Sequence, residues 1–386
     1  MGIPATSASG RRSRRGRLWE VAVLFLKLGT ISFGGPAGHI ALMEHEAVHK
    51  RQWLSRQHFL DLVAATNLVP GPNATEMAIH IGYLQAGWAG LAVAGACFIL
   101  PAFAITLALA WAYVRFGSLP QAEAILYGVK PATVAIVAMA AWRLGRASLA
   151  DWGARALFAA VLAASLLGAD DLLLLIGAGL LVVAWRERTR LPWFGLLALA
   201  APAPAIGRTL DGRLAQLFLY FLKVGSVLYG SGLVLYAFIQ KDVVQGFGWL
   251  SQQQLVDAIA AGQVTPGPVL SSATFIGYLI GGPAGAGLAT LGVFLPSFLI
   301  VALIGPWIPR LRSWAAGQAF LQGATVAALA LIVKTGLLLA RAAVVDPWTA
   351  AIAIGCLILL WRVKADAVWA IAAGAAVGLI RFLLAG

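Results

Sequence analysis

Two Pro-Gly-Pro triplets, at 70–72 and 266–268, interrupt apolar segments and are each followed by small polar residues. Proline removes a backbone donor and pushes the residue before it out of helical geometry, so a helix should end before each triplet. The helix that begins after a triplet presents free amides and the positive end of its dipole, which suit an anion. Broken backbone at membrane depth is tolerated only where protein buries it or where it lines a wet cavity. We therefore predict an anion site between the two interruptions.

The residues predicted to bind the anion are glycines that allow close backbone approach, neutral donors, and two lysines inside apolar runs. A tetrahedral oxyanion suits this inventory of many neutral donors and few full charges. The alternatives are that the triplets are hinge kinks, that the glycines serve helix packing, and that the lysines extend to a membrane interface. The predicted site consists of Lys27, Gly34, Gly35, Gly71, Asn73, Thr75, Lys223, Gly230, Gly267, Ser271 and Ser272.

Some ionisable residues inside or near the apolar segments have other candidate roles. Glu76 and His80 are four residues apart after the first triplet, and intramembrane ionisable groups are functional candidates by default, so proton coupling through them is one hypothesis. The second half has Ser272 and Ile276 at the matching positions, so such a relay would be asymmetric. For Asp61 and Asp257, which match each other between the halves, we favour a structural role.

No metal or cofactor is predicted. All five histidines fall in the first half of the chain, and His45 and His49 have the spacing of one helix face. Lys50 and Arg51 crowd that stretch, which favours a solvated face over a metal site. The two cysteines are too few and too isolated for a metal cage or a disulfide framework.

Composition places the chain in a lipid bilayer. Of its 386 residues, 61% are hydrophobic and only 11% are charged, whereas soluble domains carry about 25% charged residues. The net charge of +13 comes from basic residues scattered between apolar runs, without the basic face that nucleic-acid binding requires. Lys and Arg are concentrated on the side of the N-terminus, which the positive-inside rule places in the cytoplasm.

The chain repeats itself at an offset of about 196 residues, and both triplets obey this offset. Apolar segments at 59–83 and 88–114 match segments at 255–280 and 284–308. The first half has an odd number of expected crossings, so the second half should be inverted relative to the first, as in many transporters. The predicted fold is an all-α polytopic membrane protein of two inverted-topology repeats, with broken or re-entrant helices at the Pro-Gly-Pro and Gly-Gly-Pro motifs. The expected parts are a basic cytoplasmic segment at 1–17, a first repeat at 18–207 and a second at 208–386.

Several motifs resemble the chromate ion transporter (CHR) family in its two-domain, long-chain form. They are S-F-G-G-P-x-x-H at 32–39, W-L-S at 53–55 and P-G-P-N-A-T-E at 70–76. The resemblance implies a multi-pass carrier in the bacterial inner membrane that moves chromate outward and confers chromate resistance, with sulfate as a related oxyanion. This chain departs from the family pattern where Asn73-Ala74-Thr75-Glu76 replaces a Ser/Thr followed by Gln, so its natural substrate can differ.

The function expected from these observations is secondary export of chromate. The alternative is proton-coupled uptake of sulfate or a related oxyanion, and a remote alternative is an intramembrane enzyme. No nucleophile-base dyad, zinc-protease motif or phosphate-binding loop occurs in the sequence, so we expect no enzymatic activity. The expected partners are a small inorganic oxyanion and the lipid bilayer, with no nucleic acid and with a homodimer left open.

Overall fold

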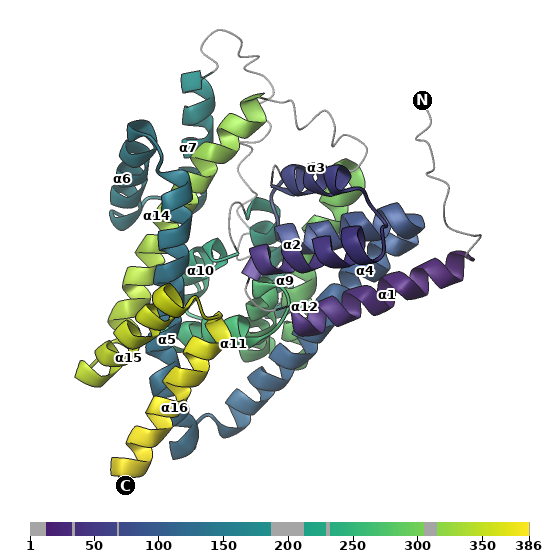
Figure 1. Ribbon diagram of the computed structural model, residues 1–386. Helices are drawn as coiled ribbons and strands as arrows, with labels where there is room; N and C mark the ends of the chain where they lie inside the picture. Colours follow the sequence, from purple (N-terminus) through teal and green to yellow (C-terminus); the bar gives the residue numbers. More distant parts are fainter. Residues whose placement is uncertain are drawn as a thin grey trace.

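The computed structural model describes residues 13–32, 35–67, 69–186, 212–228, 232–304 and 315–385. All regular elements in these ranges are helices, and five are long and apolar enough to cross a membrane. The protein is therefore an all-α membrane protein (Figure 1). The five helical stretches are Asn73–Phe116, Pro120–Ser148, Val269–Leu303, Ala315–Ala343 and Ala367–Leu384.

Each described α-helix of the first half has a counterpart in the same order in the second half, which also contains the short helices η3 and η5. Each half has a π-helix after its second helix and an interruption at its Pro-Gly-Pro triplet. The first half consists of α1 (Arg14–Ile31), α2 (Gly35–Glu44), η1 (His45–Lys50), α3 (Arg56–Thr66), α4 (Asn73–Phe116), α5 (Pro120–Ser148), α6 (Trp152–Leu166) and α7 (Asp171–Arg186). The second consists of α9 (Arg213–Val227), α10 (Val234–Phe238), η2 (Ile239–Gly246), α11 (Gln252–Val264), η3 (Val269–Ser271), α12 (Ser272–Ile304), α14 (Ala315–Ala343), α15 (Pro347–Ile358), η5 (Leu359–Val363) and α16 (Ala367–Ala385).

Local sequence explains where the helices before the triplets begin. Ser55 accepts a hydrogen bond from the backbone amide of His58 and caps α3, and Ser251 caps α11 in the same way with a complete capping box. The predicted boundary between the repeats lies within 187–211, outside the described residues. Arg14, Arg15 and Arg17 of the predicted cytoplasmic segment form the start of α1.

The long helices α4 and α12 are each bent into a hairpin. Ala86 and Gly87 leave helical geometry in α4, as Gly281 and Gly282 do in α12. A Cβ added to Gly82 would overlap the carbonyl oxygen of Gly90. In a straight helix these two residues would be about 12 Å apart along the axis, so the chain folds back between them.

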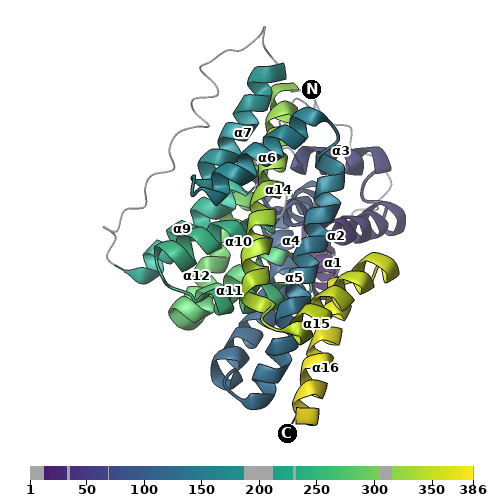
Figure 2. The same ribbon diagram turned by 90° about the vertical axis from the view of Figure 1, so that its left-hand side faces the viewer.

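The two halves interlock rather than stand side by side. Helix α5 packs against α14, α15 and α16, and α14 packs against α6 and α7 as well as α5. In Figure 2, α5 and α14 run alongside each other, with α6 and α7 at one end and α15 and α16 at the other. Each long helix thus covers the last helices of the opposite half.

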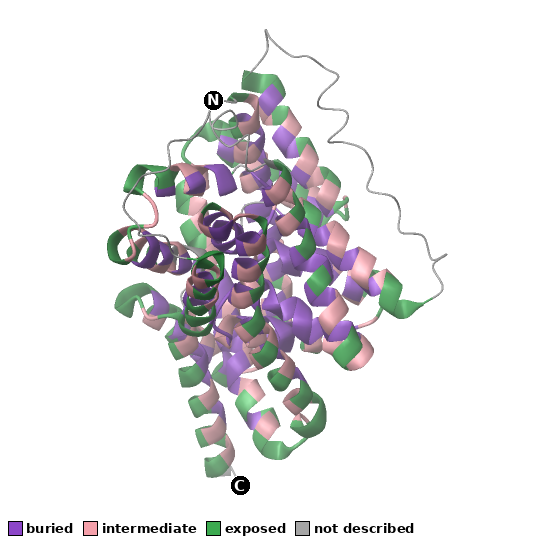
Figure 3. Ribbon diagram, turned by 90° about the vertical axis from the view of Figure 1, so that its right-hand side faces the viewer, coloured by how far each residue is buried: buried purple, intermediate pink, exposed green. Residues whose placement is uncertain are grey.

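Buried residues are concentrated inside this arrangement, and exposed residues lie on its outer faces (Figure 3). Many of the exposed residues are large and apolar. The side chains of Trp152 and Leu167, for example, are 81% and 88% exposed. An outer surface of this kind suits lipid tails, which place no penalty on exposed apolar groups.

Replacing Gly82 with Ala should destabilise the α4 hairpin, because the added methyl overlaps the Gly90 carbonyl. Overpacking of this kind costs about 1–3 kcal/mol, so we expect a lower midpoint of thermal unfolding in detergent. The matched control is Gly177→Ala in α7, where an added Cβ meets nothing within 4 Å. That change should keep or raise the midpoint, and equal midpoints for the two variants would contradict the hairpin packing.

Candidate functional site

Each Pro-Gly-Pro turn is hydrogen-bonded to the opposite half of the chain. The amide of Gly71 donates to the carbonyl of Leu228 at 2.8 Å, and the amide of Gly267 donates to the carbonyl of Ser32 at 2.9 Å. Ser32 and Leu228 are the residues at which α1 and α9 end. All four positions correspond under the offset of the repeat, so the exchange is reciprocal.

Glycine is required at both turns for its conformational freedom. Gly71 has φ of +147° and Gly267 has φ of +92°, a region that other residues rarely adopt. Space is also limited, because a Cβ added to Gly71 would overlap Oε1 of Glu76 and lie 3.0 Å from Oγ of Ser297. The first turn is therefore closely surrounded by two polar side chains.

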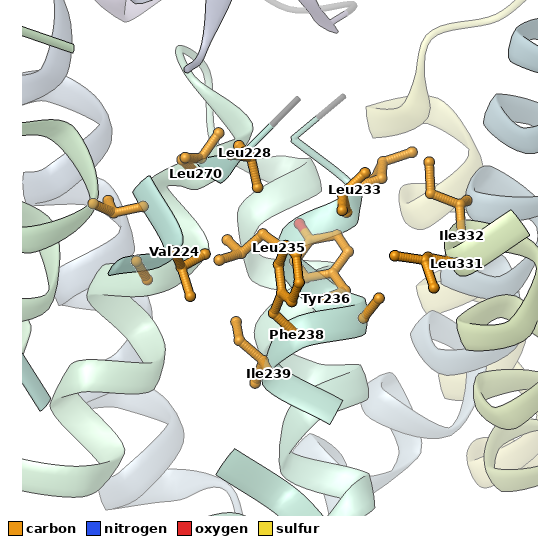
Figure 4. Close-up of a cluster of buried hydrophobic side chains, with 14 of the residues drawn as sticks. Val224, Leu228, Leu233, Leu235, Tyr236, Phe238, Ile239, Leu270, Leu331 and Ile332 are labelled. Atoms are coloured by element: carbon orange, nitrogen blue, oxygen red, sulfur yellow. The ribbon is translucent and has the colours of Figure 1, made fainter. Parts of the chain in front are cut away.

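Both turns contribute to one cavity of about 490 Å³, which we call the Pro-Gly-Pro cavity. From the first half it is lined by Gly71, Pro72 and Asn73, and from the second by Pro268 and Val269. Its apolar wall includes Leu233, Leu270 and Ile332, which belong to the buried cluster drawn in Figure 4.

The cavity wall contains the donors expected for an oxyanion site. Asn73 and Ala74 are the first two residues of α4, whose amides have no acceptor within the helix, and both line the cavity. Behind them, the hydroxyls of Thr75 and Ser271 are buried without a hydrogen-bond partner in the described part of the chain. Ser272 is also buried, and its hydroxyl donates to the carbonyl of Val269 at 3.1 Å.

The two predicted lysines lie elsewhere. Lys27 Nζ is 2.7 Å from a carboxylate oxygen of Glu46, and Lys223 Nζ is 4.0 Å from one of Asp242. The ion pairs match each other between the halves, and neither lysine lines the Pro-Gly-Pro cavity. Each ammonium thus has an ion-pair partner in its own half, and Glu46 also pairs with Lys50 and Arg51.

Cations that sequence reasoning did not assign to the site do line the cavity. They are Arg143 of α5 and Lys364, which follows η5, and both are exposed, with Asp366 beside them. In the sequence, Arg143 and Lys364 appear only as basic residues on the side of the N-terminus. Their approach to the turns depends on the packing of α5 against α15 and α16, which no local pattern indicates.

Glu76 is fully buried beside the first turn. Neither of its carboxyl oxygens has a hydrogen-bond partner among the described residues, and the same is true of Ser297 Oγ. His80, one turn further along α4, is 4% exposed. Glu76 is therefore close to the turn, but the part of the chain that the structure describes supplies no hydrogen-bonded proton relay for it.

His39 is an exception among the histidines of the first stretch. His45, His49 and His58 are exposed, whereas His39 is 2% exposed and lines the cavity. Its Nε2 lies 3.1 Å from the carbonyl oxygen of Ser32, the same oxygen that accepts from Gly267. His39 therefore supports the contact between the halves.

Three predicted glycines have little or no described surroundings. Gly34 and Gly230 lie outside the described residues, so their predicted role stays a prediction. Gly35 is the first residue of α2.

Comparisons with known proteins agree on one family. A family model described as "Chromate transporter" matches residues 19–184 and again 215–379. A chromate transport protein of Cupriavidus metallidurans is 35% identical over 395 residues, which cover 99% of this chain and 98% of that protein. A probable chromate transport protein of Synechococcus elongatus is 32% identical over 354 residues, 89% of this chain and 90% of that protein. No solved structure matches the chain.

The geometry predicts which cations face a bound oxyanion. An oxyanion present at 100 times its Kd should stabilise the protein by about 2.7 kcal/mol, seen as a rise of the unfolding midpoint in detergent. Arg143→Gln should reduce this rise, because Arg143 lines the cavity, whereas Lys27→Met should leave it intact.

The matched control is Arg146→Gln, which removes an exposed arginine of α5 that does not line the cavity. Loss of the ligand-induced rise in Lys27→Met, with Arg143→Gln unchanged, would restore the lysine to the binding site and contradict this assignment.

Proposed function

The chain belongs to the chromate transporter family, and on that premise we propose that it exports chromate across the bacterial inner membrane. Export of this kind would confer chromate resistance, and sulfate is the related oxyanion that the site would also accept. One observation carries the proposal: the interrupted helices of both halves open into a single cavity with cations among its lining residues. The relatives are named as transport proteins, which agrees with a carrier rather than an enzyme.

The chemistry of the cavity suits a doubly charged tetrahedral anion. The first amides of α4 supply neutral donors on the first-half side. The side-chain amide of Asn73 donates to Asn67 beside them. Arg143 and Lys364 outnumber the single carboxylate of Asp366, so the charged groups of the cavity sum to a positive value. Neutral donors with partly exposed cations attract a dianion without holding it permanently, which a carrier requires.

The position of the cations supports a cytoplasmic opening. With the N-terminus inside, the distribution of basic residues places both Arg143 and Lys364 on the cytoplasmic side. We infer that the cavity receives chromate from the cytoplasm. A cavity open to this side, with the opposite end closed, is the conformation in which an exporter loads its substrate.

The membrane potential supplies enough free energy for export. Moving two negative charges outward releases about 4.6 kcal/mol per 100 mV, and about 1.4 kcal/mol corresponds to a tenfold gradient. A gradient above a thousandfold therefore needs no coupled ion. Uptake of the same dianion would have to overcome this term with several cations.

The reciprocal contacts support an inverted repeat as the moving architecture. A two-fold axis that relates the halves would produce such a pair of matching hydrogen bonds, here from Gly71 to Leu228 and from Gly267 to Ser32. An odd number of crossings in the first half would place that axis in the membrane plane. Alternating access would then arise from rocking one half against the other around the two turns.

One observation favours a second candidate, proton-coupled uptake of an oxyanion. Glu76 is buried against the first turn, and its carboxyl group has no hydrogen-bond partner in the described part of the chain. A carboxyl group so placed is the kind that carries protons in transporters. The second half has Ser272 at the matching position, so only the first half would carry the proton.

Flux in proteoliposomes tests the direction of transport. With chromate inside oriented vesicles, a potential that makes the cytoplasmic side negative should accelerate its exit, and reversing the potential should slow it. At equal concentrations on both sides, chromate should move toward the positive side. Exit that follows a proton gradient and ignores the potential would contradict the proposal.

Replacing Glu76 with Gln separates the two candidates. Gln keeps the shape of the side chain and removes the ionisable proton, so potential-driven export should persist with an unchanged pH profile. The measurement is chromate flux from about pH 5.5 to 8.5 in parent and variant, spanning the range where coupled carriers respond. A pH-dependent flux that becomes flat in Glu76→Gln would support uptake coupled to protons instead.

A further inference from the structure

A second cavity lies at the other end of the helices that line the Pro-Gly-Pro cavity. It has a volume of about 540 Å³, and we call it the opposite cavity. The first part of α5 lines it with Glu123 and Lys130, whereas a later part of the same helix lines the Pro-Gly-Pro cavity from Ile136 to Ala147. Helix α11 does the same, with Asp257 in the opposite cavity and Gln263 in the Pro-Gly-Pro cavity. The two cavities are therefore arranged in line.

The barrier between the cavities is thin. Ile136 is six positions after Lys130, and Gln263 is six positions after Asp257, which corresponds to about 9 Å along each helix. Between these positions, Ala260 of α11 belongs to a buried apolar cluster that also includes Ala132 of α5. Small apolar side chains thus form the closed segment between two water-accessible spaces.

The opposite cavity contains a charged cluster at this barrier. Lys130 Nζ lies 3.7 Å from Oδ1 of Asp257, and the hydroxyl of Tyr113 donates to Oδ2 of Asp257 at 2.9 Å. The Asp257 side chain is 2% exposed and that of Lys130 is 22% exposed. Oδ1 of Asp257 has no hydrogen bond of its own, so the ammonium is its only close compensation among the described residues.

The residue types of this cluster differ in part at the matching positions of the other half. Asp61 matches Asp257, but it accepts a hydrogen bond from Gln57, and the position matching Lys130 is Gln322. The Lys130–Asp257 pair lies in the opposite cavity, away from the Pro-Gly-Pro cavity.

The two cavities also differ in the sign of their charge. Glu123 and Asp257 outnumber Lys130 in the opposite cavity, whereas Arg143 and Lys364 outnumber Asp366 in the Pro-Gly-Pro cavity. A dianion would be attracted into the Pro-Gly-Pro cavity and held weakly in the opposite cavity. This difference favours release at the end where Lys130 lies.

We propose that Lys130 is the last oxyanion-binding residue on the export path and that Asp257 keeps its affinity low. The inference rests on the proposed function, because it assigns the exit of the same substrate. A tetrahedral oxyanion that crosses the barrier meets the Lys130 ammonium, which leaves Asp257 to bind it. The buried Asp257 carboxylate is then uncompensated, which strongly favours return of the ammonium and displacement of the anion into the opposite cavity.

The test measures rebinding of chromate from the outer side. Right-side-out membrane vesicles are loaded with chromate, and efflux is followed while chromate is added outside. The quantity measured is the external concentration that halves efflux. In Asp257→Asn the Lys130 charge is no longer neutralised, so this concentration should fall about tenfold, an effect of about 1.4 kcal/mol, and maximal efflux should slow.

A double variant, Asp257→Asn with Lys130→Gln, should return the external concentration to the parent value or above, because the binding ammonium is gone. Tyr113→Phe removes only the hydrogen bond to the carboxylate, so Asp257 depends more on the Lys130 ammonium, and the concentration should shift in the direction opposite to that of Asp257→Asn, by a smaller factor. Asp61→Asn, at the matching position of the first half, serves as the control and should leave it unchanged.

The outcomes separate this inference from the proposed function. Parent vesicles that release no chromate would refute export itself. Parent vesicles that release chromate, with the same external concentration in the parent, in Asp257→Asn and in Tyr113→Phe, would overturn the inference alone. The inference would also be overturned if the double variant needed as little external chromate to halve efflux as Asp257→Asn does, since binding would then not involve Lys130.

Discussion

Two backbone hydrogen bonds hold the centre of this protein together, each joining a Pro-Gly-Pro turn of one half to a helix end of the other. They satisfy polar groups that the interrupted helices leave open at a depth where water is scarce. Because Gly71 and Gly267 adopt positive φ, each turn directs its amide toward the opposite half. The same contacts bring both helix starts to one cavity, so the interruption, the interlocking of the halves and the candidate site have a single cause.

The charges of the membrane-spanning part follow a common rule, with one departure. Lys27, Lys223 and Lys334 each lie within an apolar stretch, and each pairs with a carboxylate. Lys130 is the departure: it pairs with Asp257, but in the proposed export path its ammonium leaves that carboxylate for the anion. Pairing of this kind lowers the high cost of a charge in lipid. The cations left exposed in a cavity, Arg143 and Lys364, are then the ones available to a mobile anion. Ion-paired lysines thus stabilise the fold, whereas exposed cavity cations are free to bind the substrate.

Sequence reasoning predicted the all-α membrane fold, the duplication of the pattern and the helix interruptions, because these depend on local chemistry. The segment ends expected at 83 and 280 lie within a few residues of the kinks of α4 and α12, which are at 86–87 and 281–282. The partners of the lysines were not predicted. Glu46 of η1 is remote in sequence from Lys27, and only the packed fold brings the two together. Arg143 and Ser297 were missed for the same reason, since their neighbours come from distant helices.

Localising a bound tetrahedral oxyanion tests the central claim most directly. Selenate has the charge and shape of chromate, and its selenium atom can be located by anomalous scattering in crystals of the protein. The account predicts one strong peak in the Pro-Gly-Pro cavity, within hydrogen-bond distance of the first amides of α4. A strong peak beside Lys27 or Lys223, with no peak between the two turns, would contradict it.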